Sequence, residues 1–227
     1  MANIHAIYPA TEGEGVRIGI PQVFVRFQGC AVGCVNCDSP ETWNFKNNTQ
    51  LAISEIVSQI KTFNLDWTSI TGGNPLDSHH RSDVLELIVA LKAAGQKINI
   101  EVTGLEVDVE IFSLVDFISF DIKTPSTGVS PRRELIKKFI KQFGDKSQLK
   151  AVIQDEVDFE FAYQIYNFCA GEVLSISWVM TPACSANNPL SMKTFEWILE
   201  ENQKRGAAFR VVGQQHKWVF GQDRRDV

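Results

Sequence analysis

Short apolar segments rich in β-branched residues alternate with longer amphipathic segments from residue 23 onward, and no other feature constrains the fold as strongly. The segment 23–27 (VFVRF) is typical of a strand, and 51–63 (LAISEIVSQIKTF) is typical of a helix. Neighbouring parallel strands need a crossover, which is usually helical, so the alternation predicts an α/β fold with a mostly parallel sheet. The same patterns predict strands at 68–71, 97–104, 117–123, 149–154, 173–180 and 208–215, and helices at 81–95, 131–144, around 156–170 and 190–206.

The length of the chain helps to choose among parallel-sheet arrangements. A closed eight-fold barrel typically takes ~250 residues. Six or seven strands within 227 residues therefore predict an incomplete or compressed (β/α) barrel of about six parallel strands. A doubly wound open sheet is the competing arrangement. Because no linker or low-complexity tract interrupts residues 1–227, we predict a single domain.

Polar and glycine-rich stretches follow the predicted strands. Cys30 comes after the first strand, and TGGNP (71–75), EVTG (101–104) and DIK (121–123) end the next three. In both candidate arrangements ligands bind at the carboxyl ends of the parallel strands. We therefore expect these stretches to form one site.

Composition excludes several classes of function. The hydrophobic content of 44% is too high for a disordered chain, and a net charge of −5 gives no general attraction to nucleic acid or anionic membranes. No run approaches the roughly 20 apolar residues of a membrane span, and the N-terminal residues lack the basic and apolar regions of a signal peptide. We therefore expect a cytoplasmic protein, in which clustered cysteines are reduced and bind metal or react.

Three of the five cysteines, Cys30, Cys34 and Cys37, lie on the predicted loop 28–43. Closely spaced thiolates select zinc, copper(I) or iron–sulfur clusters. A structural zinc ion needs four ligands, whereas Cys169 and Cys184 lie far downstream. Three cysteines can instead hold three irons of a cubane cluster and leave the fourth iron open. A zinc site completed by a histidine, and thiols without a shared role, remain alternatives.

The C-x-x-x-C-x-x-C spacing after a first strand resembles the radical S-adenosylmethionine (SAM) superfamily. In that superfamily the amino and carboxylate groups of SAM chelate the open iron, and an electron from the reduced cluster cleaves SAM to methionine and a 5′-deoxyadenosyl radical. The resemblance implies that Cys30, Cys34 and Cys37 hold a 4Fe–4S cluster and that SAM is a cofactor.

The surrounding sequence narrows the resemblance. Residues 11–43, together with TGGNPL (71–76), EVTG (101–104) and QQHK (214–217), are similar to the 7-carboxy-7-deazaguanine synthase family. That family implies a cytoplasmic homodimer which receives electrons from a donor such as flavodoxin. It implies a lyase reaction in which 6-carboxy-5,6,7,8-tetrahydropterin loses ammonia to give 7-carboxy-7-deazaguanine, by hydrogen-atom abstraction and ring contraction, on the route to queuosine and other 7-deazapurines.

The resemblance also assigns residues to SAM. Asn74 stands where the superfamily usually has a glutamate that binds the SAM ammonium. An amide oxygen can still accept one hydrogen bond, but the charge-assisted part is lost. Either SAM then binds more weakly, or another carboxylate, Asp121 or Glu101, compensates. The residues assigned to SAM are Asn36, Cys37, Asp38, Gly73, Asn74, Asp121, Ile122, Lys123 and Gln154.

The substrate and magnesium residues follow from the same resemblance. Glu12 replaces the family's usual glutamine, and Arg26 lies mid-strand, where its guanidinium suits the substrate carboxylate or a structural ion pair. The resemblance assigns Ser39 to Mg²⁺, which accepts few protein oxygens. The residues assigned to the pterin substrate are Glu12, Gly13, Glu14, Arg26, Thr71 and His216.

Two other functions share parts of this pattern. A glycyl-radical-activating enzyme has the same cysteine spacing but needs neither the loop 12–14 nor Arg26 and His216. A non-catalytic interaction module with a zinc ion or a cluster is the second alternative. The tail 217–227, with two arginines flanked by aspartates, is typical of a solvated end.

Overall fold

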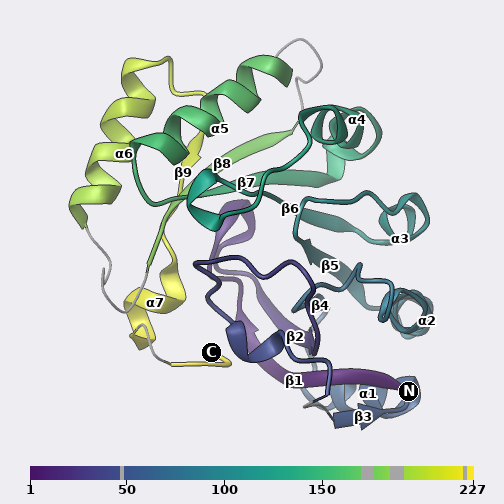
Figure 1. The fold of residues 1–227 in the computed structure, drawn as a ribbon. Coiled ribbons are helices and arrows are strands. Elements are labelled where there is room, and N and C mark those ends of the chain that lie inside the picture. The colour runs from purple at the N-terminus through teal and green to yellow at the C-terminus, as the bar shows by residue number, and fades with distance from the viewer. Residues whose placement is uncertain (47–48, 170–175, 185–191, 222–223) are drawn as a thin grey trace.

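The computed structural model describes residues 1–46, 49–169, 176–184, 192–221 and 224–227. One nine-stranded sheet runs through them in the order β3-β1-β2-β4-β5-β6-β7-β8-β9. Within the described residues no pairing joins β9 to β3, so the curved sheet in Figure 1 stays open. The parallel strands are β2 (Pro21–Phe27), β4 (Trp67–Gly72), β5 (Lys97–Val102), β6 (Phe117–Ile122), β7 (Ser147–Ile153), β8 (Ser177–Pro182) and β9 (Arg210–Val211). The predicted incomplete barrel is confirmed.

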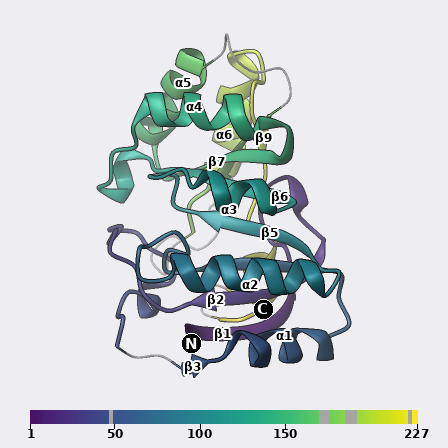
Figure 2. The same ribbon diagram turned by 90° about the vertical axis from the view of Figure 1, so that its right-hand side faces the viewer.

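Helices cover the outer face of the sheet, and Figure 2 shows α2, α3 and α4 stacked along it. Helix α4 explains why: it buries Ile136, Phe139, Ile140 and Phe143, which lie on one side of a 3.6-residue period. Among the described residues, none of the helices is both long and apolar enough to cross a membrane. The helices are α1 (Ile53–Thr62), α2 (Arg81–Ala93), α3 (Val109–Leu114), α4 (Arg133–Phe143), α5 (Glu156–Cys169), α6 (Met192–Lys204) and α7 (Gln215–Phe220).

The structure differs from the sequence prediction at both ends of the chain. Strand β1 (Ala2–Thr11) was not predicted; it runs antiparallel to β2 and also pairs with the short β3 (Thr49–Leu51). Its irregular burial pattern lacks strict alternation, so the pairing with β2 decides its conformation. The predicted strand 208–215 is reduced to β9, because the chain turns into α7 at Gln215.

Three predicted elements fall partly on residues that the structure does not describe. The last residue of the helix predicted around 156–170 lies outside the described residues, and α5 occupies the rest. The first three residues of the predicted strand 173–180 lie outside the described residues, and β8 occupies the rest. The first two residues of the predicted helix 190–206 also lie outside them, and α6 follows. Helix α3 and the short 3₁₀ helices were not predicted. The latter are η1 (Gly15–Arg17), η2 (Pro40–Thr42), η3 (Pro125–Thr127) and η4 (Gly144–Lys146).

The loop between β1 and β2 closes one end of the barrel. The Arg17 guanidinium stacks 3.7 Å from the ring centroid of Trp67, the first residue of β4. The backbone N–H of Val16 donates to the side chain of Gln148, near the start of β7, at 2.8 Å. This loop therefore lies at the amino ends of the parallel strands, while the cysteine loop follows the carboxyl end of β2.

Candidate active site

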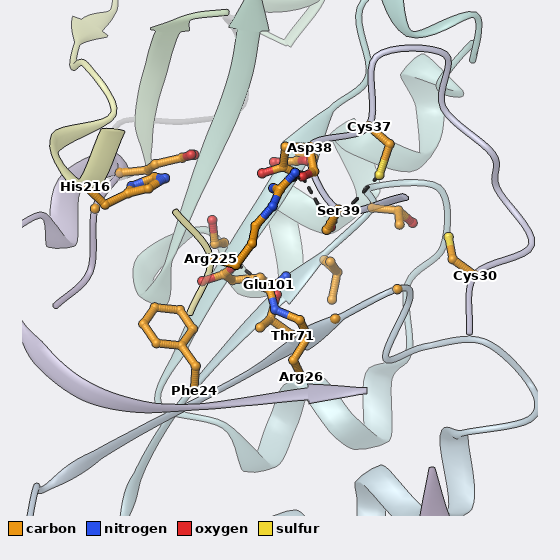
Figure 3. A pocket seen from close by; sticks show the side chains of 18 of the residues that line it. Phe24, Arg26, Cys30, Cys37, Asp38, Ser39, Thr71, Glu101, His216 and Arg225 are labelled. Carbon is orange, nitrogen blue, oxygen red and sulfur yellow. Dashed lines mark hydrogen bonds between the residues drawn. The ribbon is translucent and has the colours of Figure 1, made fainter. Parts of the chain in front are cut away.

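One cavity lies between these two loops and joins most of the residues assigned from the sequence (Figure 3). The sequence-assigned residues that line it are Glu12, Gly13, Glu14, Arg26, Cys30, Cys34, Cys37, Asp38, Ser39, Thr71, Gly73, Asp121, Lys123 and His216. They come from the loop 12–14, the cysteine loop, the strands β2, β4 and β6 with the residues that follow them, and α7. Segments from both ends of the chain thus meet at one site.

Backbone hydrogen bonds hold the cysteine loop where its two ends meet and again at its middle. The Gly29 N–H donates to the Thr42 carbonyl at 2.7 Å, and the Val35 N–H donates to the Thr127 carbonyl at 2.9 Å. Cys30, Cys34 and Cys37 are unoxidised, partly exposed and lie on the same cavity. Among the described residues, no three His, Cys, Asp or Glu side chains converge on a single metal-ion position. A 4Fe–4S cluster needs cysteines that each reach a different iron, and three thiols along one loop fit it.

Glycines allow β4 to end directly against this loop. A Cβ at Gly73 would lie 2.2 Å from the Gly29 carbonyl oxygen and 3.0 Å from Cys30 Cβ. Gly72 has φ +130°, and a Cβ there would lie 2.3 Å from the Phe27 backbone. Side chains at these positions would displace the backbone that carries Cys30. The pair Gly72-Gly73 therefore sets the distance between the cysteine loop and the sheet.

Asn74 does not line the cavity. Its side chain is buried: Nδ2 donates to Glu106 at 3.0 Å, and Oδ1 accepts from the Leu76 N–H at 3.2 Å. Burial raises the pKa of Glu106, and the bond from Asn74 opposes that shift. Of the carboxylates expected to compensate, Asp121 and Glu101 both line the cavity. A contact between Asn74 and SAM stays a prediction.

Two lysines surround Asp121 at the end of β6. Lys123 Nζ donates to Asp121 Oδ2 at 2.9 Å, and Lys150 Nζ, from β7, lies 3.7 Å from Asp121 Oδ1. Burial favours the protonated carboxyl, but the two ammonium groups outweigh it and lower the pKa of Asp121. Asp121 is therefore ionised where it faces the cavity.

Glu14 lies at the centre of a second set of contacts. Lys150 Nζ donates to Glu14 Oε2, and Gln214 Nε2 donates to Glu14 Oε1. The N–H of Gln215, the first residue of α7, donates to the Gly13 carbonyl at 2.9 Å. A Cβ at Gly13 would lie 2.1 Å from His216 Nδ1, so only glycine lets the His216 ring pack there. The start of α7 is thereby fixed against the loop 12–14.

Glu12 and Glu14 have opposite pKa shifts. Burial, with Glu101 and Glu14 nearby, raises the pKa of Glu12 to about 8. Burial acts in the same direction on Glu14, but Lys150 and His216 outweigh it and lower the pKa of Glu14 to about 2. At neutral pH the loop therefore presents one protonated carboxyl, which can donate, and one carboxylate, which can only accept. Burial also lowers the pKa of His216.

Arg26 points into the cavity from β2, as Figure 3 shows. Its Nη2 donates to the Tyr8 hydroxyl at 2.9 Å. Burial would lower the pKa of Arg26, but Tyr8 and the carboxylates of Asp38 and Glu101 outweigh it and raise it. A guanidinium carries five N–H donors, so Arg26 can hold Tyr8 and a ligand carboxylate together.

Thr71 contributes through Glu101, which also lines the cavity. The Thr71 hydroxyl donates to Glu101 Oε2 at 2.9 Å, and the Ser69 hydroxyl donates to Glu101 Oε1 at 3.1 Å. Burial raises the pKa of Glu101, although Lys150 opposes that shift. Both oxygens of Glu101 are thus oriented by β4.

Ser39 and residues 224–227 of the tail also line the cavity. The Ser39 hydroxyl donates to Asp38 Oδ1 at 3.4 Å and lies 4.0 Å from Cys37 Sγ. Two oxygens next to each other are the hard ligands that Mg²⁺ accepts. Arg225 Nη1 donates to the Asp38 carbonyl, and residues 224–227 line the cavity. Arg224, Arg225 and Asp226 are exposed, as expected for a solvated end, although they also line the cavity.

Three further residues that the resemblance assigns to SAM lie elsewhere. Asn36 is exposed and donates to the Ser126 hydroxyl at 3.2 Å, which fastens the cysteine loop to η3. Ile122 is 2% exposed and belongs to the core. Gln154 is exposed and lines a separate, shallow pocket with residues of α6. Their contacts with SAM stay predictions.

Sequence reasoning missed several residues that line the cavity. Tyr8 lies on β1, which was not predicted, and Lys150 lies on β7. Lys150 carried the same signal as Arg26, a cation inside an apolar strand (LKAVIQ, 149–154), and could have been found in this way. Gln148 and the tail carried no comparable signal.

Comparisons with known proteins agree with this geometry. Residues 11–118 match the family model described as a 4Fe-4S single cluster domain. The chain is 28% identical over 219 residues to a protein of Thermoplasma acidophilum, covering 96% of this chain and 97% of the relative. It is 26% identical over 242 residues to a protein of Leptospira interrogans, covering 98% and 97%. Both relatives are named 7-carboxy-7-deazaguanine synthase.

Solved structures support the fold. QueE from Escherichia coli matches with a TM-score of 0.73 at 19% identity, covering 95% of this chain and 94% of that chain. Streptococcus suis SuiB bound to S-adenosylmethionine matches with a TM-score of 0.59 at 14% identity, covering 82% of this chain and 48% of that chain.

The open parallel barrel with a three-cysteine loop after β2 defines the class of protein: the chain has the radical SAM fold with a loop for a 4Fe–4S cluster. Within that class it is similar over nearly its whole length to proteins named 7-carboxy-7-deazaguanine synthase, and the resemblance predicted from the sequence is thereby confirmed.

Proposed function

We propose that this chain is a radical SAM lyase that converts 6-carboxy-5,6,7,8-tetrahydropterin to 7-carboxy-7-deazaguanine with loss of ammonia. The observation that carries the proposal is the single cavity, which has the three cysteines on one wall and Glu14, Arg26 and His216 on others. The names of relatives that match nearly the whole chain supply the product, 7-carboxy-7-deazaguanine.

Cys30, Cys34 and Cys37 would hold the cluster, with SAM beside it. When bound, the cluster and SAM supply the radical that takes a hydrogen atom from carbon 6 of the pterin. Asp121 and Lys123, at the end of β6, would bind polar groups of SAM, since both are charged and line the cavity. Position 73 would admit SAM close to the backbone, because it has no side chain.

The chain's own side chains orient the substrate. Arg26 binds the pterin carboxylate, because its guanidinium faces the cavity with donors beyond the one used by Tyr8. Glu14 accepts from N–H groups of the aminopyrimidinone ring, and the protonated Glu12 can donate to a ring acceptor, as the family's usual glutamine can. Ser39 and Asp38 would hold Mg²⁺ beside the substrate carboxylate.

The protein would act in the cytoplasm as a homodimer and receive electrons from a small donor such as flavodoxin. The lack of a membrane-spanning helix in the described part of the chain is compatible with this location. Sedimentation of the cluster-loaded protein would measure the oligomeric state.

The direct test is turnover. Anaerobically reconstituted protein is incubated with carboxytetrahydropterin, SAM and dithionite, and products are identified by mass spectrometry. We expect 7-carboxy-7-deazaguanine and ammonia, with SAM regenerated and not consumed. If SAM is cleaved but no deazaguanine forms, the substrate assignment is wrong. If SAM is not cleaved at all, the chain is a non-catalytic module.

A matched cysteine pair tests the cluster assignment. The Cys37→Ala variant should lose iron and the absorbance near 400 nm, because a cubane needs each of the three thiolates. The Cys184→Ala variant should keep about four irons per chain, since Cys184 lies outside the cysteine loop. Equal iron loss in the two variants would contradict the assignment.

A further inference from the structure

We propose that Lys150 is a positioning residue that links Glu14 to Asp121 and thereby couples substrate binding to SAM binding. The identity of the two ligands, substrate and SAM, rests on the proposed function. The connection between Glu14 and Asp121 rests on the contacts of Lys150 alone. No motif in the sequence assigned a role to Lys150.

Lys150 reaches two carboxylates on different elements. Its Nζ donates to Glu14 Oε2 on the loop that precedes η1, and it lies 3.7 Å from Asp121 Oδ1 at the end of β6. The side chains of Lys150 and Glu14 are each 14% exposed, and that of Asp121 is 25% exposed. All three line the cavity, so a ligand can contact the two carboxylates directly.

Glu14 and Asp121 each make a further hydrogen bond to another residue. Glu14 Oε1 accepts from Gln214, which precedes α7, and Asp121 Oδ2 accepts from Lys123. A continuous row of polar contacts therefore runs from the start of α7, past the substrate loop, to the residues below the cysteine loop. Lys123 and Cys34 line the same cavity.

The charge of Lys150 makes its contacts with Glu14 and Asp121 depend on bound ligands. Burial lowers the pKa of Lys150, but Glu14, Asp121 and Glu101 outweigh it, so the ammonium is charged and needs an anionic partner. In this structure the Lys150 ammonium donates to Glu14 but lies 3.7 Å from Asp121 Oδ1, beyond hydrogen-bond distance. A ligand that binds Asp121 therefore changes the strength of the contact between Lys150 and Glu14. By thermodynamic linkage, a ligand that binds Glu14 changes the contact between Lys150 and Asp121 in return.

The test uses SAM alone, so that it does not depend on the pterin. The dissociation constant of SAM is measured by titration calorimetry for cluster-loaded wild type, Glu14→Gln, Lys150→Met and the double variant. Glu14→Gln removes the carboxylate to which Lys150 donates and leaves Asp121 as its ion-pair partner, and we expect SAM binding about 5-fold weaker or more. In the Lys150→Met background the same change should alter SAM binding less than about 2-fold.

Lys146→Met serves as the control variant. Lys146→Met removes an ammonium that donates to the Val115 carbonyl outside the cavity, and it should leave the response to Glu14→Gln unchanged. An equal effect of Glu14→Gln in the wild-type and Lys150→Met backgrounds, or no effect in either, overturns the proposal. If Lys150→Met does not fold, the cycle is run between Glu14→Gln and Asp121→Asn, and additive effects on SAM binding overturn it. A protein that passes this test yet makes no deazaguanine would refute only the proposed function.

Discussion

At the scale of single residues, two glutamates two positions apart carry different charge. Glu12 is buried beside Glu101 and Glu14, while Glu14 is paired with Lys150. Two residues of the same type on one loop can therefore differ in protonation, one donating and one accepting hydrogen bonds, because their surroundings differ. Lys150 makes the difference, because it compensates one carboxylate and leaves the other to be protonated.

Glu12 should make stability depend on pH. Its pKa is raised from 4.5 to about 8, so between these values the folded protein keeps a proton that the unfolded chain has released. Stability from this group is therefore present below pH 4.5 and is lost as pH rises toward 8. We expect the wild-type melting temperature to fall between pH 5.5 and 8 by on the order of 5 °C more than that of Glu12→Gln.

The comparison separates Glu12 from its neighbours. Glu101 has a pKa raised in the same direction and stays in both proteins, and Glu14 contributes in the opposite direction only below pH 4.5. Glu156→Gln, which alters an exposed carboxyl on α5, serves as the control and should melt like the wild type at each pH. Parallel melting curves for wild type and Glu12→Gln would show that Glu12 is ionised in the folded protein.

Arg26 should contribute to substrate binding. We expect Arg26→Gln to reduce kcat/KM by about 10- to 100-fold, since a hydrogen bond between charged groups is lost. Tyr8→Phe removes the protein partner of Arg26 but keeps the guanidinium, so its effect should be smaller. Steady-state kinetics with carboxytetrahydropterin measures both. A larger loss in Tyr8→Phe would mean that Arg26 is mainly structural.

At the scale of elements, close backbone contacts position the cysteine loop and the loop 12–14. The end of β4 lies against the cysteine loop at Gly73, and the loop 12–14 lies against the start of α7 at Gly13. In both places the space is too small for a Cβ, so the glycines set the geometry of the cavity. These backbone contacts fix the positions of both loops, and so the positions of the side chains that the loops carry.

Gly73→Ala should therefore disturb cluster binding more than it disturbs the fold. A Cβ there would meet the Gly29 carbonyl oxygen at 2.2 Å, and relief requires the cysteine loop to move. We expect iron content after reconstitution to fall at least about 2-fold, measured by colorimetric iron assay. Gly95→Ala places a left-handed residue (φ +81°) in open space and should cost about 1 kcal/mol of stability with no loss of iron. Full iron content in Gly73→Ala would contradict this account.

At the scale of the whole molecule, the two ends of the chain complete the site. The loop after β2 carries the cysteines and the ends of the barrel strands carry charged groups, whereas β1, α7 and the tail supply Tyr8, His216 and Arg225. The hydrogen bonds of Gln214 and Gln215 with the loop 12–14 connect residues about 200 positions apart. The cavity is therefore closed only when the entire chain has folded.

A truncation after Val212 should separate the two halves of the site. It keeps β9 but removes α7 and the tail. We expect the truncated protein to bind iron and SAM, because the cysteine loop and Asp121 are retained, but to form no product, because His216 and the support of Glu14 are lost. Iron assay, calorimetry with SAM and mass spectrometry measure the three properties. Product formation at the wild-type rate would exclude a role for α7.

Local sequence patterns predicted the repeated strands and helices, and the cysteine spacing predicted a cluster-binding loop. Arg26 was recognised as a buried cation within an apolar strand, and most of the residues assigned by resemblance line the cavity. Strand β1 was missed, because its pattern is irregular and its partner β2 defines it. The position of Asn74 against Glu106 could not be read from the sequence, because 32 residues separate them.

The sequence by itself determined the period of the elements, the order of strands and helices, and the three thiols on one loop, because each depends on residues close together in the chain. Only the tertiary structure decided which carboxyls are charged, that Lys150 joins Glu14 to Asp121, and that both ends of the chain meet at the cavity. The physical reason is that burial and pairing are properties of distance in space. The contact between Glu14 and Lys150 spans 136 positions, and no local pattern records it.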